Sequence, residues 1–485
     1  MKRVRILGHR PATIAIVLLS LLFAACSCVS ALIALVAWLN NMPFDWSWPL
    51  LASALVTCIF GTISWIWLDR HIFNVVPSAS FAYTFDDGPW LSFRGDPRTS
   101  IVVNWVTKDV TGTRVEYSQF GHPPSIVTGV PGRIHHLVLD GLVAGTRYSY
   151  RVLDFSKNGT IHEFTTAPAT PGPFRFAVIG DTQNGGGKSP EQWAYPRLLE
   201  AIAAAKPAFI AHAGDATDQG NDLVSWHEFF DAKPQILATT PLHVAAGNHD
   251  TGTHALTDRS QKKRPDEGAN YDYFFDYPYG MPRDEDEITA MRGRFYSFTY
   301  GNCLFVFADT QTNRLANPRN PQWQWLHEVL GAAPAGAWKI VVMHRDSVSI
   351  KRRKDASLYE MDYDKFAPYL LPIFLEHGVD VVFQGHVHEY FHLAYTHGIT
   401  PPLPGMDIAA SKGQVIHFIT SGGGGNILRR NDPLLPGGCT IPGFTRRENS
   451  SHFLIVDVDG DAMTIEARYP DGALMERTSI RRRGT

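Results

Sequence analysis

The sequence predicts a chain of three parts: two membrane-spanning helices in residues 1–70, a small all-β sandwich in residues 80–169 and a layered α/β domain in residues 172–485. Three observations lead to this prediction. Two long runs near the N-terminus lack charged residues, the next segment alternates apolar and polar residues between turns, and the rest repeats an apolar strand followed by a polar side chain. A length of 485 residues also favours two or three structural units over one core.

The composition is that of a folded protein without a preference for nucleic acid. Hydrophobic residues make up 44% and charged residues 19% of the chain, which is enough to bury a large core. The formal net charge is −3 and the isoelectric point about 6.7, so no overall positive field would attract nucleic acid. Three of the five cysteines lie in the apolar N-terminal runs, so the remaining chain is not expected to depend on disulfides.

The N-terminal part is predicted to form a helical hairpin in a membrane. Residues 12–39 and 50–68 are uncharged, and each run can cross about 30 Å of hydrocarbon. A cleaved signal peptide is the alternative, because the residues ending at Cys26 resemble a lipoprotein cleavage site, but the apolar run continues well past them. Basic residues precede the first run and the connector carries only Asp45, so the positive-inside rule places everything after the second span in the cytoplasm. The exported side is the alternative.

The second part is interpreted as a β-sandwich. Short alternating segments, such as residues 101–106 and 148–152, are separated by Gly, Pro and Asp turns. The motif TFDDGP at residues 84–89 matches a metal-binding signature of polysaccharide deacetylases. Those enzymes need a further pair of histidines four residues apart, which does not follow in this part, so the motif is interpreted as a turn into the first strand.

In the third part, five apolar strands are each followed by side chains that can bind metal ions. The carboxyl ends of strands are where α/β sheets place ligands, and helical runs at residues 194–206 and 322–330 indicate a layered α/β fold. Carboxylate, amide and imidazole donors together suit Mn, Fe or Zn, and their number implies two ions. The candidate metal ligands are Asp181, Asp215, Asn248, His344, His386 and His388.

The order GD, GD, GNHD, H and GHxH resembles that of the calcineurin-like metallophosphoesterase superfamily. The segments GPWLSFRGDPRTSIVVNWVT and HHLVLDGLVAGTRYSYRV resemble the fibronectin type III-like domain that precedes the catalytic domain of purple acid phosphatases. The resemblance implies a layered α/β metallophosphoesterase sandwich with a binuclear centre of Fe, Mn or Zn. It also implies that Asp181 and His388 bind one ion, that Asn248, His344 and His386 bind the other, and that Asp215 bridges them.

The resemblance further implies that metal-activated water hydrolyses the phosphomonoester of a phosphorylated small molecule. A small-molecule phosphodiesterase, or a degenerate domain that binds phosphorylated ligands without turnover, is the alternative. His249 is left free for the substrate, as a transition-state stabiliser or general acid, and Asp250 is expected to orient it.

The sequence departs from the family at two positions beside the expected ligands. Purple acid phosphatases carry a tyrosine three residues after the bridging aspartate, where this chain has Asp218, so no tyrosinate-to-iron colour is expected. Other superfamily members carry a histidine two residues after the first aspartate, where this chain has Gln183. Asp218 and Gln183 are therefore possible ligands or hydrogen-bonding groups behind the ligands. Arg345 is a candidate phosphate contact.

Other motifs are interpreted as structural. Residues 388–392 match the HExxH pattern of zinc proteases, but they follow a strand and a glycine, where the required helix is not expected. The glycine-rich residues 184–189 are interpreted as a loop beside the site. Residues 421–425 are interpreted as a turn, with close approach of the backbone to a substrate as the alternative. The basic run 351–354 is interpreted as a solvated face, and residues 258–294 as an insertion near the mouth of the site.

Overall fold

The structure is a computed structural model that describes residues 83–482, except 158, 186–191, 252–268, 278–293, 312–320, 353–358, 404–411 and 426–439. The two predicted membrane helices in residues 1–70, and most of the predicted insertion, lie outside the described residues. Within the described ranges, no helix is long and apolar enough to cross a membrane.

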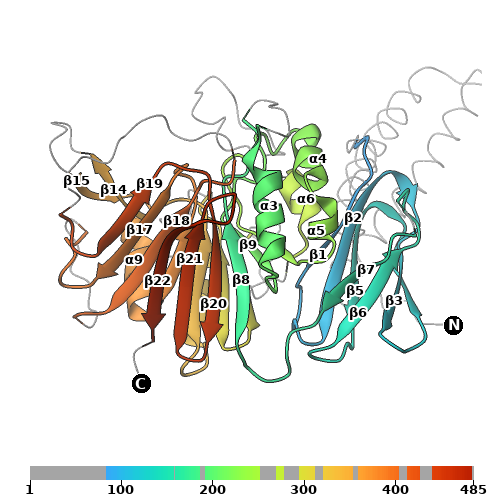
Figure 1. Cartoon of the computed structure of the whole chain (residues 1–485), viewed down its shortest axis with the longest axis horizontal. Coiled ribbons are helices and arrows are strands. Elements are labelled where there is room, and N and C mark those ends of the chain that lie inside the picture. The colour runs from blue at the N-terminus through green and yellow to red at the C-terminus, as the bar shows by residue number, and fades with distance from the viewer. Residues whose placement is uncertain are drawn as a thin grey trace, which may run out of the picture. The chain divides into compact units, whose positions relative to one another are not determined.

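An all-β domain comes first (Figure 1), as the alternating pattern predicts. It consists of a three-stranded sheet in the order β1-β2-β5 and a four-stranded sheet in the order β4-β3-β6-β7. Along β6, every second side chain is buried, so that Tyr148 and Tyr150 face the interior beside Phe164. The strands are β1 (Asp87–Ser92), β2 (Ser100–Thr111), β3 (Arg114–Gln119), β4 (Ser125–Thr128), β5 (Gly132–Asp140), β6 (Arg147–Val152) and β7 (His162–Thr165).

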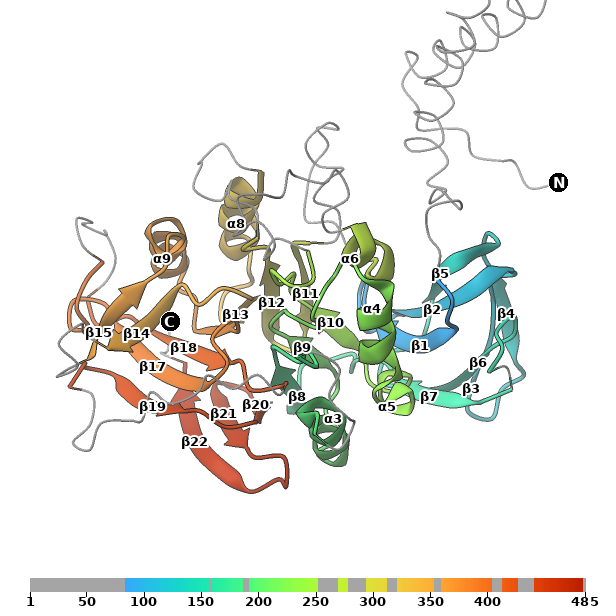
Figure 2. The same ribbon diagram turned by 90° about the horizontal axis from the view of Figure 1, so that it is seen from above.

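Two larger sheets form the α/β domain that follows (Figures 1 and 2). The six-stranded sheet has the order β10-β9-β8-β20-β21-β22, and the seven-stranded sheet has the order β11-β12-β13-β16-β18-β17-β19. The first contains β8 (Phe174–Ile179), β9 (Ile210–His212), β10 (Leu242–Val244), β20 (Phe453–Asp459), β21 (Ala462–Arg468) and β22 (Leu474–Arg481). The second contains β11 (Tyr296–Tyr300), β12 (Cys303–Ala308), β13 (Trp338–Met343), β16 (Val381–Gln384), β17 (Tyr390–Thr396), β18 (Val415–Ser421) and β19 (Phe444–Glu448).

The two sheets pack face to face through aromatic side chains. Phe176 on β8 meets Phe305 on β12 edge-on, with ring centroids 5.0 Å apart, and meets Phe383 on β16 at 6.1 Å. Strands β8, β9 and β10 run parallel, as do β12, β13 and β16. The carboxyl ends of the strands in each parallel set therefore meet at one edge.

Helices surround the two sheets. They are α3 (Ala194–Ala204), α4 (Leu223–Asp231), α5 (Pro234–Leu237), α6 (Ala269–Phe274), α8 (Pro321–Gly331) and α9 (Ala367–Glu376). Helices α8 and α9 share one apolar core with the seven-stranded sheet, in which Leu326 and Phe374 join Val341 of β13 and Val382 of β16. The two helical runs predicted from the sequence are thus helical in the structure.

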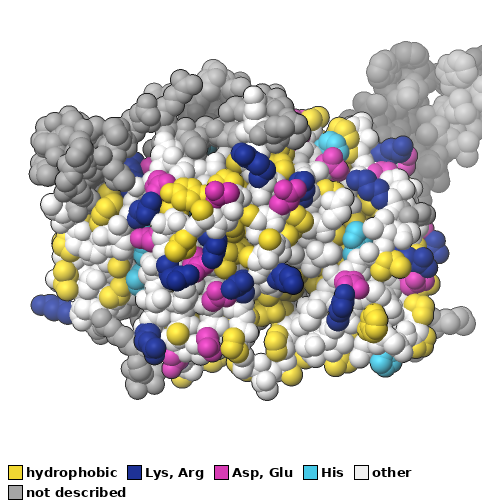
Figure 3. Space-filling view, in the orientation of Figure 1, with side chains coloured by type: hydrophobic (Ala, Val, Ile, Leu, Met, Phe, Trp, Pro, Cys, Tyr) yellow, Lys and Arg dark blue, Asp and Glu magenta, His cyan; other side chains and the backbone are white. Residues whose placement is uncertain are grey.

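Charged side chains of both signs are interspersed over the face of the molecule that Figure 3 shows. On the six-stranded sheet they pair across and along strands: Arg175 lies 2.8 Å from Asp457, and Glu466 accepts from Arg477 at 2.6 Å. In the hairpin of β14 (Val348–Arg352) and β15 (Tyr359–Tyr363), Lys351 of the basic run pairs with Asp362. The pairs Arg175–Asp457 and Lys351–Asp362 are exposed and therefore contribute little to stability.

The all-β domain contacts the helices of the α/β domain directly. The ring of Trp90 on β1 stacks on Phe230 of α4, with centroids 4.1 Å apart. The hydroxyl of Tyr150 donates a 2.7 Å hydrogen bond to the carbonyl oxygen of Ala238, just after α5. The limits predicted for the three parts of the chain remain predictions.

Candidate metal centre

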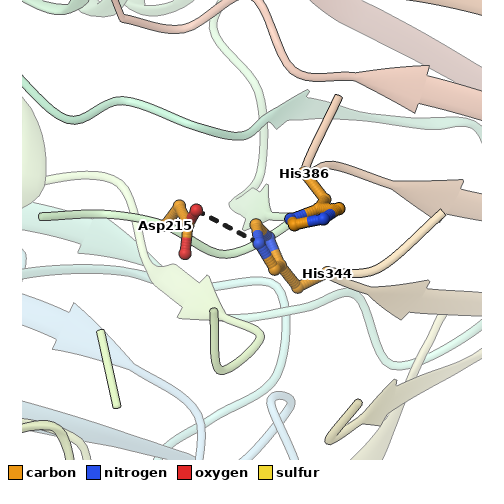
Figure 4. Close-up of side chains that lie close together, drawn as sticks. All are labelled: Asp215, His344 and His386. Carbon is orange, nitrogen blue, oxygen red and sulfur yellow. Dashed lines mark ion pairs between the residues drawn. The ribbon is translucent and has the colours of Figure 1, made fainter. Parts of the chain in front are cut away.

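Strands from both sheets bring the predicted ligands together. Asp215, which follows β9, lies beside His344, which follows β13, and His386, which follows β16 (Figure 4). Among the described residues, three groups each bring donor atoms within 4.8 Å of one another, and Asp215 belongs to two of them. The first group is Asp215, His344 and His386, and the second is Asp181, Asp215 and His388.

The backbone is strained at three of these positions. The φ angles of Asp181, Asp215 and His386 are 55°, 54° and 70°, in the left-handed region that residues other than glycine rarely adopt. Of the other described non-glycine residues, only Lys206 has a positive φ. Strain of this kind persists where the surrounding structure imposes it, and it concentrates at functional sites.

His344 lies at the centre of the first group. Its side chain is fully buried, and Nδ1 is 2.9 Å from the carbonyl oxygen of Ala213. A carbonyl can only accept, so Nδ1 carries the hydrogen and Nε2 has a free lone pair in the neutral ring. Nε2 lies 3.0 Å from Asn248 Oδ1 and 3.2 Å from Asp215 Oδ2. This arrangement of an anchored ring facing oxygen donors is typical of metal-binding histidines.

The electrostatics of the site favour a positive charge. Burial lowers the pKa of His344, but the carboxylates of Asp215 and Asp181 outweigh burial and raise this pKa to about 9. Burial raises the pKa of Asp215, but the charge and hydrogen bond of His344 and the contacts with His249 hold it well below its usual value. The carboxylates thus attract a proton or a cation to the space between the rings.

The second group forms where β16 leads into β17. Both carboxylate oxygens of Asp181 accept from the backbone N–H of His386, at 3.0 and 2.9 Å. Nε2 of His388 lies 3.4 Å from Asp181 Oδ1 and 3.3 Å from Nε2 of Gln183. Within the described part of the chain, the amide oxygen of Gln183 is buried without a hydrogen-bond partner. An orphaned oxygen beside a carboxylate and an imidazole fits the surroundings of a metal ion.

Asp250 and His249 have different hydrogen-bond partners in the structure, whereas the sequence led us to expect that Asp250 orients His249. The ring nitrogen Nδ1 of His249 donates to the backbone carbonyl oxygen of Asp218 at 2.7 Å instead. The carboxylate of Asp250 is fully buried and accepts four backbone N–H groups at 2.8 to 3.1 Å, those of Asp215, Ala216, Thr217 and Gly247. Asp250 therefore shapes the ligand-bearing loops.

His249 lies at the open side of the site. About a quarter of its side chain is exposed, and Nε2 is 3.9 Å from Asp215 Oδ2. Asp218 contributes its main-chain carbonyl to this arrangement, and its carboxylate belongs to none of the donor groups found in the described ranges. The ring of His249 is thus anchored on one nitrogen and accessible near the other.

The glycine-rich residues 421–425 allow close packing around the site, which goes beyond the turn expected from the sequence. A Cβ on Gly422 would lie 2.1 Å from the carbonyl oxygen of Val387 and 3.2 Å from Asp181 Oδ2. A Cβ on Gly385 would lie 2.5 Å from the same carboxylate oxygen. Side chains at these positions would displace Asp181.

Two further residues support the site. Nε2 of His212 lies 2.9 Å from the Thr182 hydroxyl, and burial lowers the pKa of His212 to about 3, so its ring is neutral. The sequence reasoning missed His212, although a histidine in an apolar strand was an available signal. Nη1 of Arg345 lies 3.4 Å from Nε2 of His386, so this guanidinium borders the donor groups.

Two motifs that match those of other enzyme families, HExxH and TFDDGP, make structural contacts. Tyr390 begins strand β17, so the HExxH match does not lie on a helix, and Glu389 pairs with Arg447 at 2.8 Å. In the TFDDGP motif, Asp87 pairs with His227 of α4 at 2.9 Å. Within the described ranges, Glu389, His392 and the TFDDGP residues belong to none of the donor groups, whereas His388 of the HExxH match belongs to the second group.

The two-sheet α/β fold, with carboxylate, amide and imidazole donors at the strand ends, defines a metallophosphoesterase. The pattern of the family "Calcineurin-like phosphoesterase" matches residues 174–390, and that of the family "Purple acid Phosphatase, N-terminal domain" matches residues 87–166. Residues 174–390 therefore belong to the calcineurin-like phosphoesterase family, and residues 87–166 form a purple acid phosphatase N-terminal domain.

Known relatives of this chain include proteins named as purple acid phosphatases. "Probable inactive purple acid phosphatase 9" of Arabidopsis thaliana is 26% identical over 315 residues, covering 58% of this chain and 46% of the relative. "Purple acid phosphatase 22" of the same plant is 25% identical over 299 residues, covering 61% and 59%. The chain thus matches less than two thirds of the length of either relative. The solved structure of purple acid phosphatase PPD1 from yellow lupin shares the fold, with a TM-score of 0.63 at 17% identity over 82% of this chain and 75% of that one.

Proposed function

We propose that this chain hydrolyses the phosphomonoester of a small molecule at a centre of two transition-metal ions. The observation that carries the proposal is that two groups of donor atoms, each compact enough for one ion, share Asp215. Asp181 and His388 would hold one ion and Asp215 would bridge to the other, which Asn248, His344 and His386 would hold. The mixed oxygen and nitrogen donors suit Fe, Mn or Zn.

Side chains around the centre supply the remaining chemistry. When bound, two such ions activate water and neutralise charge on the phosphoryl group. Arg345 binds a phosphate oxygen from the side of His386, since its guanidinium borders that ring. His249 donates a proton to the departing oxygen through Nε2, because Nδ1 is committed to the Asp218 carbonyl.

A second candidate function is the binding of phosphorylated ligands without turnover. Two departures at the site favour it: Gln183 stands where a histidine is common, and Asp218 stands where purple acid phosphatases have tyrosine. One relative is also named as inactive. Phosphodiester hydrolysis is the alternative within the same reaction class.

Metal content and activity together test the proposal. The full chain, purified in detergent, is expected to retain two transition-metal ions and to hydrolyse p-nitrophenyl phosphate faster than bis(p-nitrophenyl) phosphate. The reverse preference would indicate a phosphodiesterase. Two bound ions without turnover of either ester would indicate the binding protein, and fewer than two ions without turnover would reject the metal centre.

We also propose that residues 1–70 anchor the chain in a membrane as a helical hairpin. Support comes from the two uncharged runs, and the basic residues before the first run favour a cytoplasmic catalytic domain. A reporter fused after Thr485 should behave as a cytoplasmic protein and fractionate with membranes. An exported reporter would show that the charge bias does not decide the orientation.

A further inference from the structure

A second cluster of metal-binding side chains lies on the helical layer outside the seven-stranded sheet. His327 belongs to α8, while Glu376 ends α9 and His377 follows it directly. One donor atom of each residue lies within 4.8 Å of the others. We propose that these three residues hold a zinc ion that links α8 to α9. This inference does not depend on the proposed phosphatase activity.

The distances suit one ion between the three side chains. Two donors held 2.0–2.1 Å from a tetrahedral zinc ion lie roughly 3.3 Å apart. Nδ1 of His327 is 2.9 Å from Nε2 of His377 and 3.7 Å from Glu376 Oε2, and Nε2 of His377 is 3.9 Å from Glu376 Oε1. These separations bracket the value for a shared ion, and the two carboxylate oxygens face one ring each.

The position of Glu376 distinguishes this cluster from a simple hydrogen bond between two histidine rings. The contact between His327 and His377 alone could be a hydrogen bond, because one neutral ring can donate to another. Glu376, however, lies beyond hydrogen-bonding distance of both nitrogens although it faces them. Two imidazoles and a carboxylate are a donor set that zinc commonly takes, with a fourth position left for water.

The donors are held in place by the structure around them. The ammonium of Lys339 donates to the carbonyl oxygen of His377 at 2.5 Å, which fixes the end of α9. The ring of Trp323 packs edge-on against His327 at 4.3 Å.

This cluster lies far from the first metal centre. Helix α9 precedes β16, so His377 lies near the amino end of that strand, whereas His386 follows its carboxyl end. Strand β13 runs beside β16 and parallel to it, and the six residues of β13 span roughly 20 Å. A zinc ion here would brace the helices behind the two strands that present His344 and His386, without touching a substrate at the first centre.

Counting zinc in matched variants tests the proposal. The full chain is stripped with a chelator, loaded with zinc alone, desalted and analysed by mass spectrometry. We expect the double variant His327→Gln, His377→Gln to hold one zinc ion fewer per chain than the unaltered protein. The control His122→Gln removes an exposed histidine of the all-β domain and should retain the full amount. The variants at this cluster should also keep the ions and activity of the first centre.

Two further measurements test the proposed zinc site. Zinc should raise the Tm of the unaltered chain more than that of the double variant, and anomalous diffraction at the zinc edge should show a peak between His327 and Glu376. Equal zinc content in a folded double variant would overturn the proposal and leave a hydrogen-bonded histidine pair. If the double variant does not fold, the exposed substitution Glu376→Gln takes its place, and unchanged zinc retention in that variant would likewise overturn the proposal.

Discussion

His344 and His249 show how the same anchoring prepares two histidines for different roles. Each ring donates from Nδ1 to a main-chain carbonyl, that of Ala213 or that of Asp218. His344 is fully buried among oxygen donors, whereas His249 reaches the open side of the site. The first ring therefore suits a metal ion, and the second suits a substrate that comes and goes.

Replacing His249 with alanine should separate proton donation from metal binding. His249→Ala is expected to keep both ions and to lose roughly 10²–10⁴-fold in kcat. An alkyl phosphate should suffer far more than p-nitrophenyl phosphate, because the alkoxide leaves poorly without a proton. Steady-state kinetics on both esters, with metal analysis of the same samples, make the comparison.

The matched control for this experiment is Asp215→Asn. It removes the carboxylate shared by the two donor groups, so it should lose metal and slow both esters alike. Equal losses on both esters in His249→Ala, with metal content intact, would reject proton donation and leave phosphate orientation as the role of His249.

Arg345 should contribute to substrate affinity. Because a charged hydrogen bond contributes about 1.5–3 kcal/mol, Arg345→Ala is expected to raise KM for a phosphomonoester by roughly 10–100-fold with a smaller change in kcat. Lys351→Ala removes an exposed cation of the β14–β15 hairpin and serves as the control. An unchanged KM in Arg345→Ala would place this guanidinium outside the substrate site.

At the scale of elements, the loops after β9 and β10 depend on one buried carboxylate. Asp250 accepts backbone N–H groups from both loops, and these loops carry Asp215 and Asn248. Burial and the neighbouring charge of Asp215 raise the pKa of Asp250, while its backbone donors oppose that effect. The carboxylate of Asp250, which holds the loops, therefore lies directly behind Asp215, a candidate metal ligand.

The variant Asp250→Asn should loosen these loops. An amide in place of the carboxylate turns a donor toward backbone N–H groups, and each buried donor left unsatisfied costs about 1–3 kcal/mol. We expect a lower free energy of unfolding in urea and easier loss of metal to a chelator. Asp471→Asn, which affects one exposed backbone N–H, is the control and should change neither. Unchanged metal retention in Asp250→Asn would show that the loops hold their shape without this carboxylate.

The sequence predicted the main elements and which residues would meet, but it did not predict their hydrogen bonds. The apolar runs before Asp181, Asp215 and His344 form strands because their spacing and content allow little else. The partners of Asp250 could not be predicted from adjacency in the chain, because its carboxylate accepts backbone N–H groups from the loops after β9 and β10. Backbone hydrogen-bond partners such as the Ala213 carbonyl are brought into place by tertiary packing. They cannot be predicted from the residue types in the sequence.

At the scale of the whole molecule, the all-β domain is attached to the α/β domain by a charged contact as well as by aromatic packing. Asp87 on β1 is almost fully buried and lies 2.9 Å from Nδ1 of His227 on α4. Burial lowers the pKa of His227, but the hydrogen bond and charge of Asp87 outweigh this and raise it. The contact between the two domains is therefore sensitive to pH.

The pH dependence has a definite sign. Because the folded-state pKa of His227 lies above its unfolded value of 6.5, its stabilising effect is complete below pH 6.5 and is lost as pH rises through the folded-state pKa. The ring is partly exposed, so solvent screening limits the effect to about 1 kcal/mol or less. In urea unfolding, the stability difference between the unaltered chain and His227→Gln should shrink from about pH 5.5 to about pH 8.5. A constant difference would show that the pair does not titrate in this range.

The pairing of strands that lie far apart in the sequence determines when the metal centre can form during synthesis of the chain. Strand β8 pairs with β20, so the sheet that presents Asp181 stays incomplete until residues 453–459 have left the ribosome. Ions would then be captured only after β20 has been made, in whichever compartment folding finishes. Since similar donors accept several transition metals, the supply in that compartment would decide which metal the finished protein carries.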